Sequence, residues 1–172
     1  MRSLLERIKI IDYATIYLEI EKNEFLRLLK NNVDLGSTKS DFFEPFMGGK
    51  LDFRGQVSQN GFKIRRKKRF FDYNRSSAIV TGQVSQKNEQ TKVNMEINSF
   101  NNSIYFVIGG LALMCLVFFS IAFSISDFPI FVLPIVLLHG FFMIGIFAYT
   151  MRKSTSQLKK DIEKELYYIT KK

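Results

Sequence analysis

The sequence has few of the side chains on which enzyme chemistry most often depends. It contains one histidine and one cysteine, and both lie in long apolar runs. The rest of the chain therefore has no His or Cys with which to build a nucleophile–base pair. With Cys115 alone, no intramolecular disulfide is possible. The absence of an HExxH motif and of paired cysteines argues against zinc. We expect a protein without catalytic activity and without a cofactor.

A phosphate-binding loop is also absent, although FMGGKL at 46–51 contains part of one. Glu44 stands where that motif has its first glycine, and Leu51 stands where it has a Ser or Thr for magnesium.

Charge is missing from two long stretches. Residues 104–123 contain no charged side chain, and residues 128–149 contain no Asp, Glu, Lys or Arg. A helix needs about 20 apolar residues to cross the hydrocarbon core of a bilayer. Both stretches reach that length, and only Ser124 to Asp127 separate them. The sequence therefore predicts a transmembrane hairpin with helices at 103–124 and 128–150.

The distribution of Lys and Arg predicts the orientation of this hairpin. The loop between the two stretches has neither residue, whereas residues 61–92 contain nine and residues 152–172 contain seven. Cytoplasmic flanks of membrane spans collect Lys and Arg. We therefore expect a multi-pass protein of the inner, cytoplasmic membrane with both termini in the cytoplasm. Charges interrupt the first apolar run, MRSLLERIKIIDY, which is thus not a secretory signal peptide.

The residues before the hairpin predict a cytoplasmic α+β portion over 1–100. Apolar and polar side chains alternate, as in half-buried strands, at about 10–20, 51–58, 62–68, 79–86 and 91–98. Phe25, Leu28 and Leu29 share one face of a helix at about 21–32, and the Gly- and Pro-containing segment 34–50 is interpreted as a loop. The predicted fold class is an α+β membrane protein: a small antiparallel β-meander with an N-terminal strand and helix, the hairpin, and a C-terminal amphipathic helix.

The pentapeptide GQVSQ occurs twice, at 55–59 and at 82–86. Its two copies represent either two hairpins in the same register or a coincidence of common strand residues. Gly55 and Gly82 fall on the apolar face, which indicates close approach by another element, and the 21–32 helix is the candidate. Asn60 and Gly61 predict a type I′ turn, because both residues tolerate a positive φ.

The tail predicts a helix at 154–170. Leu158, Ile162, Leu166 and Ile169 form an apolar stripe flanked by charges. We expect this stripe to pack on the β section.

The strongest charge cluster is KIRRKKR at 63–69. This cluster has three possible interpretations. It could bind anionic lipid head groups, at about 1 kcal/mol per charge, or an acidic partner. Alternatively, it is a solvated strand end that follows the positive-inside bias. Nothing here resembles a helix that reads DNA bases, so nucleic acid is disfavoured. The candidate binding residues are Lys63, Arg65, Arg66, Lys67, Lys68 and Arg69.

His139 lies near the middle of the second apolar stretch. An ionisable residue inside a membrane is by default a functional hypothesis. The alternatives are proton sensing, a hydrogen bond to Ser120, Tyr105 or a second subunit, and a neutral imidazole bonded to a backbone carbonyl near Pro134.

The arrangement FRGQV…GFKIRRK…YNRSS…VTGQV…TKVNMEI, followed by a membrane hairpin and a short helix, resembles a diffuse group of small uncharacterised bacterial membrane proteins. The resemblance implies two spans and a cytoplasmic α+β portion, and it implies no activity. We expect a membrane-tethered binding or scaffold module. The alternatives are an oligomeric effector or small channel acting through the hairpin, and a sensor that couples the soluble part to a membrane partner.

Overall fold

The computed structural model describes residues 2–38, 51–67, 78–100, 103–124 and 132–171. The chain forms two compact units. Unit 1 combines Met1–Ser99 with Met151–Lys172, and unit 2 is Phe100–Thr150. Unit 1 is therefore assembled from chain segments that lie on both sides of unit 2 in the sequence.

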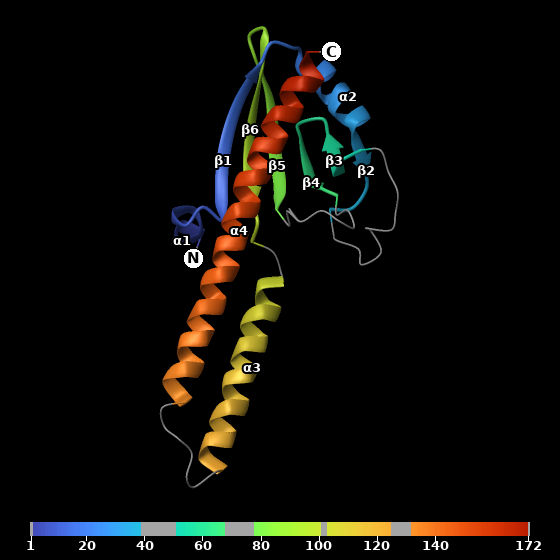
Figure 1. Ribbon diagram of the computed structural model, residues 1–172. Coiled ribbons are helices and arrows are strands. Elements are labelled where there is room, and N and C mark those ends of the chain that lie inside the picture. Colours follow the sequence, from blue (N-terminus) through green and yellow to red (C-terminus); the bar gives the residue numbers. More distant parts are fainter. Residues whose placement is uncertain (1, 39–50, 68–77, 101–102, 125–131, 172) are drawn as a thin grey trace. The chain divides into compact units, whose positions relative to one another are not determined.

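Unit 1 is built on a six-stranded mixed sheet (Figure 1). The strands follow the order β1-β6-β5-β4-β3-β2, in which β2 runs parallel to β3 and every other neighbouring pair is antiparallel. The elements before unit 2 are α1 (Arg2–Arg7), β1 (Ile11–Leu18), α2 (Lys22–Asn32), β2 (Val33–Leu35), β3 (Phe53–Ser58), β4 (Gly61–Arg66), β5 (Ile79–Lys87) and β6 (Gln90–Asn98).

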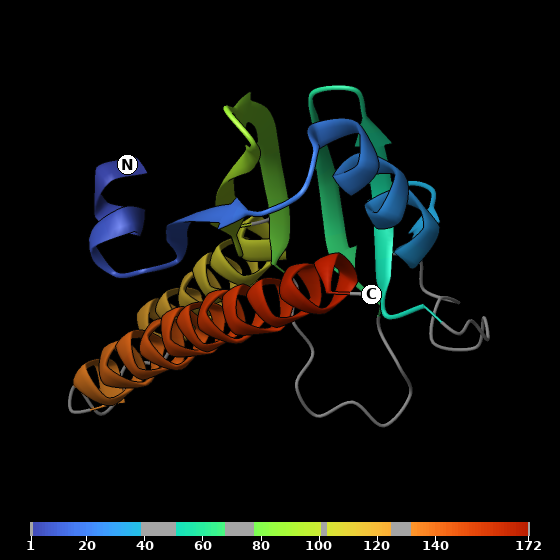
Figure 2. The same cartoon turned by 90° about the horizontal axis from the view of Figure 1, so that it is seen from above.

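Alternation along the strands gives the sheet one buried face. Apolar side chains at every second position, such as Ile64, Val80 and Ile97, are fully buried. Two helices cover this inner face: α2, and the C-terminal part of α4 (Val132–Thr170), which runs across the sheet (Figures 1 and 2). The helices contribute to the same core Phe25, Leu29, Leu158, Ile162, Leu166 and Ile169. The stripe predicted at 154–170 therefore lies in the core.

Unit 2 contains α3 (Ser103–Ser124) and the part of α4 that ends at Thr150. A side chain added at Gly140 would lie 3.8 Å from Leu111, so α4 is close to α3 at this point. Many large apolar side chains are exposed, among them Leu113, Leu138 and Phe141. In the part of the chain that the structure describes, one helix, Pro134–Thr170, is long and apolar enough to cross a membrane; Ile108–Ile121 is apolar but shorter.

The prediction of an α+β fold is confirmed, but a purely antiparallel meander is wrong. Strands β3 to β6 do form a meander, and β1 and β2 extend it at its two edges. The parallel strand β2, Val33–Leu35, is not among the predicted strands, and its residues 34 and 35 fall in the predicted loop. Its three residues are too few to show a strand pattern, and its position depends on pairing with β3, whose Phe53 lies opposite Val33. The remainder of the predicted loop, 39–50, lies outside the described residues.

The predicted type I′ turn is also wrong. Neither Asn60 nor Gly61 has a positive φ. Gly61 already belongs to β4 and pairs with Ser58, so the loop consists of residues 59 and 60. A Cβ at Gly61 would collide with the carbonyl oxygen of Gly82, which explains the glycine by close approach. The carbonyl of Asn60 accepts a hydrogen bond from the Val84 N–H, and its side chain accepts one from Lys22 Nζ at 2.9 Å.

The two GQVSQ glycines do make room for a neighbour, and that neighbour is β4. A Cβ at Gly55 would overlap the Lys63 carbonyl oxygen and lie 2.7 Å from the Ile64 Cα. A Cβ at Gly82 would enter the ring of Phe62, its direct cross-strand partner. The nearest atoms at both positions thus belong to a strand, where the sequence had suggested the α2 segment.

Candidate functional site

The basic run is divided between the two faces of the sheet. Because strand residues alternate, Lys63 and Arg65 lie on the outer face, whereas Arg66 lies on the inner face with Ile64. The Lys63 side chain is exposed, but Arg65 is only 4% exposed. The Arg65 Nε donates a 2.9 Å hydrogen bond to the carbonyl oxygen of Thr38. Arg65 is thus a structural residue of unit 1.

Two further cations of the run are paired within unit 1. The Arg66 guanidinium contacts Asp161 Oδ2 of α4 at 2.6 Å, and Lys67 pairs with Asp34. The hydrogen bond from Lys67 lowers the pKa of Asp34 below its usual value. Lys68 and Arg69 lie outside the described residues. Of the four described members of the predicted binding set, Lys63 alone projects into solvent without a partner.

The outer face of the sheet is an open polar surface. Cross-strand rows contain Gln56, Lys63, Thr81, Glu96 and Tyr13, and beside them Ser58, Gln83, Asn94 and Thr15. Two hollows lie on this face, one of about 370 Å³ over β1, β6 and β5 and one of about 320 Å³ over β3, β4 and β5. Both are lined by Thr81 and Gln83, so they form one polar groove. We call this surface the outer groove.

The outer groove carries cations that form no ion pair with described residues. Its acid Glu96 is neutralised by Arg2 of α1 at 2.7 Å, and the Tyr13 hydroxyl donates a 2.7 Å hydrogen bond to Glu6. Lys63 forms no ion pair with described residues, and Lys92 lies 6.0 Å from the centre of the Tyr17 ring. Arg54, in the row beyond Gln56, has a buried Nε with no acceptor. A groove with this charge is suited to a negatively charged ligand.

Hydroxyl groups form hydrogen bonds within unit 1 close to Ser99 and Met151, the residues at which its two chain segments end and begin. Ser99 and Thr155 are buried, and their hydroxyl oxygens are 2.6 Å apart. The Thr155 hydroxyl donates to the Ile10 carbonyl at 2.8 Å, and the Ser99 N–H donates to the same oxygen at 3.1 Å. We call Ser99, Thr155 and Ile10 the hydroxyl clamp.

An ion pair supports the clamp from α4. Lys159 Nζ lies 3.0 Å from Asp12 Oδ2 and donates to the Tyr13 carbonyl at 2.9 Å. Burial alone would raise the pKa of Asp12. The hydrogen bond from Lys159, the Tyr13 N–H and the charges of Lys159 and Lys9 outweigh burial, so the pKa of Asp12 is lower than usual.

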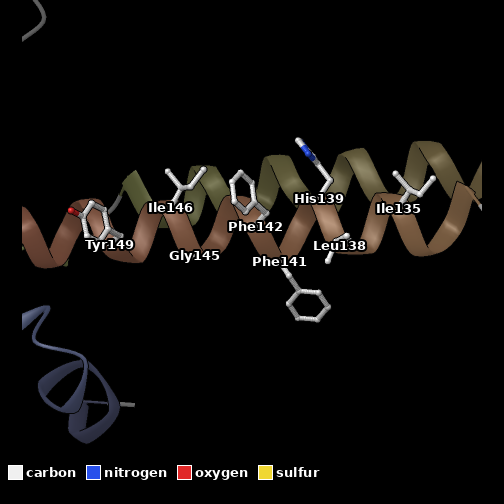
Figure 3. Close-up of a pocket in the computed structure, with 8 residues that line it drawn as sticks. All are labelled: Ile135, Leu138, His139, Phe141, Phe142, Gly145, Ile146 and Tyr149. Atoms are coloured by element: carbon white, nitrogen blue, oxygen red, sulfur yellow. The ribbon is translucent and has the colours of Figure 1, made fainter.

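His139 is exposed on the surface of unit 2 and has no hydrogen-bond partner among the described residues. Ser120 donates instead to the Leu116 carbonyl of its own helix at 2.9 Å. The imidazole lines a hollow of about 840 Å³ on α4, and Figure 3 shows it on the same side of the helix as Ile135, Phe142 and Ile146. Together with Tyr149, these residues are spaced alternately by four and three, the spacing of a helix-packing seam.

No His, Cys, Asp or Glu residues of the described ranges gather in a group of three or more that could hold a metal ion. No protein-family model matches this chain, and no curated protein with which it was compared matches it either. The geometry of unit 1 and unit 2 therefore carries the functional argument.

Sequence reasoning missed the residues that define the outer groove and the hydroxyl clamp. Thr81, Gln83, Asn94 and Ser99 are small polar residues without a motif. Strand alternation could have assigned the first three to one face, but only the strand order places β5 beside both β4 and β6. The clamp joins positions 10, 99 and 155, and no local signal connects them.

Proposed function

We propose that this protein is a non-enzymatic binding module tethered to the inner membrane, with unit 2 inserted as a two-span hairpin and unit 1 in the cytoplasm. The proposal depends on the assembly of unit 1 from two chain segments, one before and one after unit 2. Its core contains both residues before unit 2, such as Ile97, and residues after it, such as Leu158. If unit 2 enters the bilayer, the chain must return to the side from which it left.

Element lengths support this topology. At about 1.5 Å per residue, the 22 residues of α3 extend about 33 Å, close to the hydrocarbon thickness of about 30 Å. The α4 segment from Val132 to Thr150 is almost as long. Exposed side chains such as Leu116 and Phe142 would be costly in water but are suited to lipid.

The hairpin can be tested by cysteine accessibility in a Cys115→Ser background. We expect an impermeant thiol reagent to label Ser126→Cys from outside intact cells. Tyr17→Cys and Tyr168→Cys, which replace exposed side chains of the two segments of unit 1, should react only after permeabilisation. Labelling of Tyr17→Cys and Tyr168→Cys from opposite sides would contradict the proposal.

Within this module, the outer groove is the proposed binding surface, and an acidic segment of a partner protein is the proposed ligand. The positive charges of Lys63, Lys92 and Arg54 favour a negatively charged ligand, while Thr81 and Gln83 offer donors and acceptors. We expect a photo-crosslinking residue at Gln83 to form an adduct in cells that is lost with Lys63→Glu and retained with Lys63→Arg. The same residue at Tyr168 is the matched control, because it is exposed outside the groove. Equal adducts from both positions would remove the groove from the proposal.

A second candidate function, an oligomeric membrane effector or small channel, is favoured by His139. An imidazole exposed within an apolar stripe is expensive in lipid unless another helix covers it. If the seam of Ile135, His139, Phe142 and Ile146 packs between copies, reconstituted protein should conduct ions with a pH dependence that His139→Leu removes. Absence of conductance between pH 5 and 8 would exclude a channel gated by His139.

A further inference from the structure

The end of unit 1 that carries the hydroxyl clamp has a second feature, the short helix α1. The Ile10 carbonyl, directly after α1, is the atom to which Ser99 and Thr155 both donate. These two residues lie beside the points where the chain leaves unit 1 and re-enters it at Met151. Figure 1 shows α1 at the end of β1 that lies beside the end of β6.

One side of α1 is fastened to the sheet, and the other is not. Arg2 and Glu6 hold Tyr13 and Glu96 through contacts of 2.7 to 3.0 Å. Leu4 lies in α1, and Ile8 lies in the turn directly after it, where its N–H donates to the Leu4 carbonyl at 3.0 Å. Their side chains are 60% and 36% exposed. Arg7 is exposed on the same side, between them in sequence.

Some cations of unit 1 form salt bridges and others do not. Arg2, Arg66, Lys67 and Lys159 each form a salt bridge. Four exposed cations at this end of unit 1 form no salt bridge within the described residues: Arg7, Lys9, Arg152 and Lys153.

From this juxtaposition we infer that α1 lies in the head-group region of an anionic bilayer, with Leu4 and Ile8 inserted and Arg7, Lys9, Arg152 and Lys153 bound to lipid phosphates. The inference rests on the proposed membrane insertion of unit 2. A basic helix with apolar side chains on one face enters the interface to a depth of about 5–10 Å. The four cations would lie close to the cytoplasmic ends of the proposed spans, where Lys and Arg are most strongly enriched.

Because the chain has no tryptophan, single tryptophans can report the position of α1. We would reconstitute the full chain in vesicles with acyl chains brominated near the head group, with and without phosphatidylglycerol. Leu4→Trp is the probe. Tyr17→Trp, also exposed and about 20 Å further along β1 from Ile11, is the matched control. Phe118→Trp on α3 reports whether unit 2 is inserted.

We expect bromine to quench Leu4→Trp and Phe118→Trp but not Tyr17→Trp. The quenching of Leu4→Trp should weaken without phosphatidylglycerol, or at 1 M salt, where the Debye length falls to about 3 Å. Adding Arg7→Gln and Lys9→Gln to Leu4→Trp should weaken its quenching as much as the removal of phosphatidylglycerol does. If Phe118→Trp is quenched and Leu4→Trp is not, the inference is overturned and the hairpin stands. If neither is quenched, the proposed insertion of unit 2 fails, and the inference fails with it.

Discussion

At the scale of the residue, the role of a side chain in unit 1 depends on what lies opposite it on the next strand. Gly55 and Gly82 occupy the same place in identical pentapeptides, yet Gly55 faces backbone atoms of β4 and Gly82 faces the Phe62 ring. The basic run shows the same dependence, since Lys63 is free while Arg65 is buried two positions further along. A pentapeptide or a charge run therefore does not by itself define a site.

The two glycines should respond differently to alanine. Gly82→Ala is expected to destabilise the protein by about 1–3 kcal/mol, because the new methyl group overpacks against the Phe62 ring. Phe62→Leu should relieve part of that cost, since the clash is with a side chain. Gly55→Ala should be more damaging and not be relieved, because its methyl group meets the backbone of Lys63 and Ile64.

Urea unfolding of the full chain in detergent, arranged as a double-mutant cycle, measures both effects. Gly145→Ala is the control, because no atom lies within 4 Å of a Cβ there and alanine is the better helix former. A milder effect of Gly55→Ala than of Gly82→Ala would contradict this account.

Asp12 should make the stability of unit 1 sensitive to acid. Its pKa is lower in the folded than in the unfolded chain, so its carboxylate stabilises the fold above pH about 4. That contribution is lost as the pH falls through the folded pKa. We expect Asp12→Asn to lower the free energy of unfolding at pH 7 by about 1 kcal/mol or less, as is typical of a partly exposed pair.

Thermal unfolding from pH 7 to pH 3 provides the measurement. The gap between the wild type and Asp12→Asn should narrow below pH 4, and Lys159→Gln should behave in the same way. A gap that stays constant over this range would show that the carboxylate charge does not contribute.

At the scale of the element, helices and strands with clear periodicity could be predicted from the sequence, whereas elements defined by partners could not. The alternation around Val80, Val93 and Ile97 indicates strands on its own, and the stripe at Leu158 and Ile162 indicates a helix. By contrast, α1 and β2 have six and three residues, too few for periodicity. Pairing across the sheet places β2, and contacts with Tyr13 and Glu96 hold α1.

Less of the candidate site than of the fold could be predicted from the sequence, because the site also depends on partners that are distant in the chain. Lys63 could be identified from charge alone. The neutralisation of Arg66 and Lys67 depends on Asp161 and Asp34, which lie far from them in sequence. Local pattern finds charges, but only the folded chain shows which of them remain unpaired.

The hydroxyl clamp predicts a specific cost at the junction of β6 and α4. Thr155→Val retains the shape of the side chain but leaves the buried Ser99 hydroxyl without its acceptor, which costs about 1–3 kcal/mol. The Ser99→Ala/Thr155→Val double variant should recover part of this loss, because neither apolar side chain then requires a partner. Thr170→Val is the control, since that hydroxyl bonds only within α4. Urea unfolding in detergent measures the loss of stability. Equal losses of unfolding free energy for Thr155→Val and Thr170→Val would rule out the clamp.

At the scale of the whole molecule, the main consequence of the fold is that unit 1 is discontinuous. Met1–Ser99 supplies the sheet, and Met151–Lys172 supplies the helix that closes its core. The two segments meet at Ser99 and Thr155, whose hydroxyl oxygens are 2.6 Å apart. Unit 2 is therefore an insertion between two neighbouring points of unit 1, and the stability of unit 1 should not depend on it.

This arrangement predicts that unit 1 folds without its membrane segment. Phe100–Thr150 would be replaced by a Gly/Ser linker of about six residues, whose end-to-end distance of about 12–15 Å is enough to join Ser99 to Met151. We expect a protein that stays soluble, shows mixed α and β circular dichroism and unfolds cooperatively in urea. In the linked protein, Leu158→Ala should lower the free energy of unfolding by about 2–5 kcal/mol, as expected for a fully buried leucine.

Residues 1–99 alone should not fold, because the inner face around Val80 and Ile97 would lack Leu158, Ile162 and Leu166. The same unfolding midpoint for this fragment and for the linked protein would mean that α4 does not complete the core.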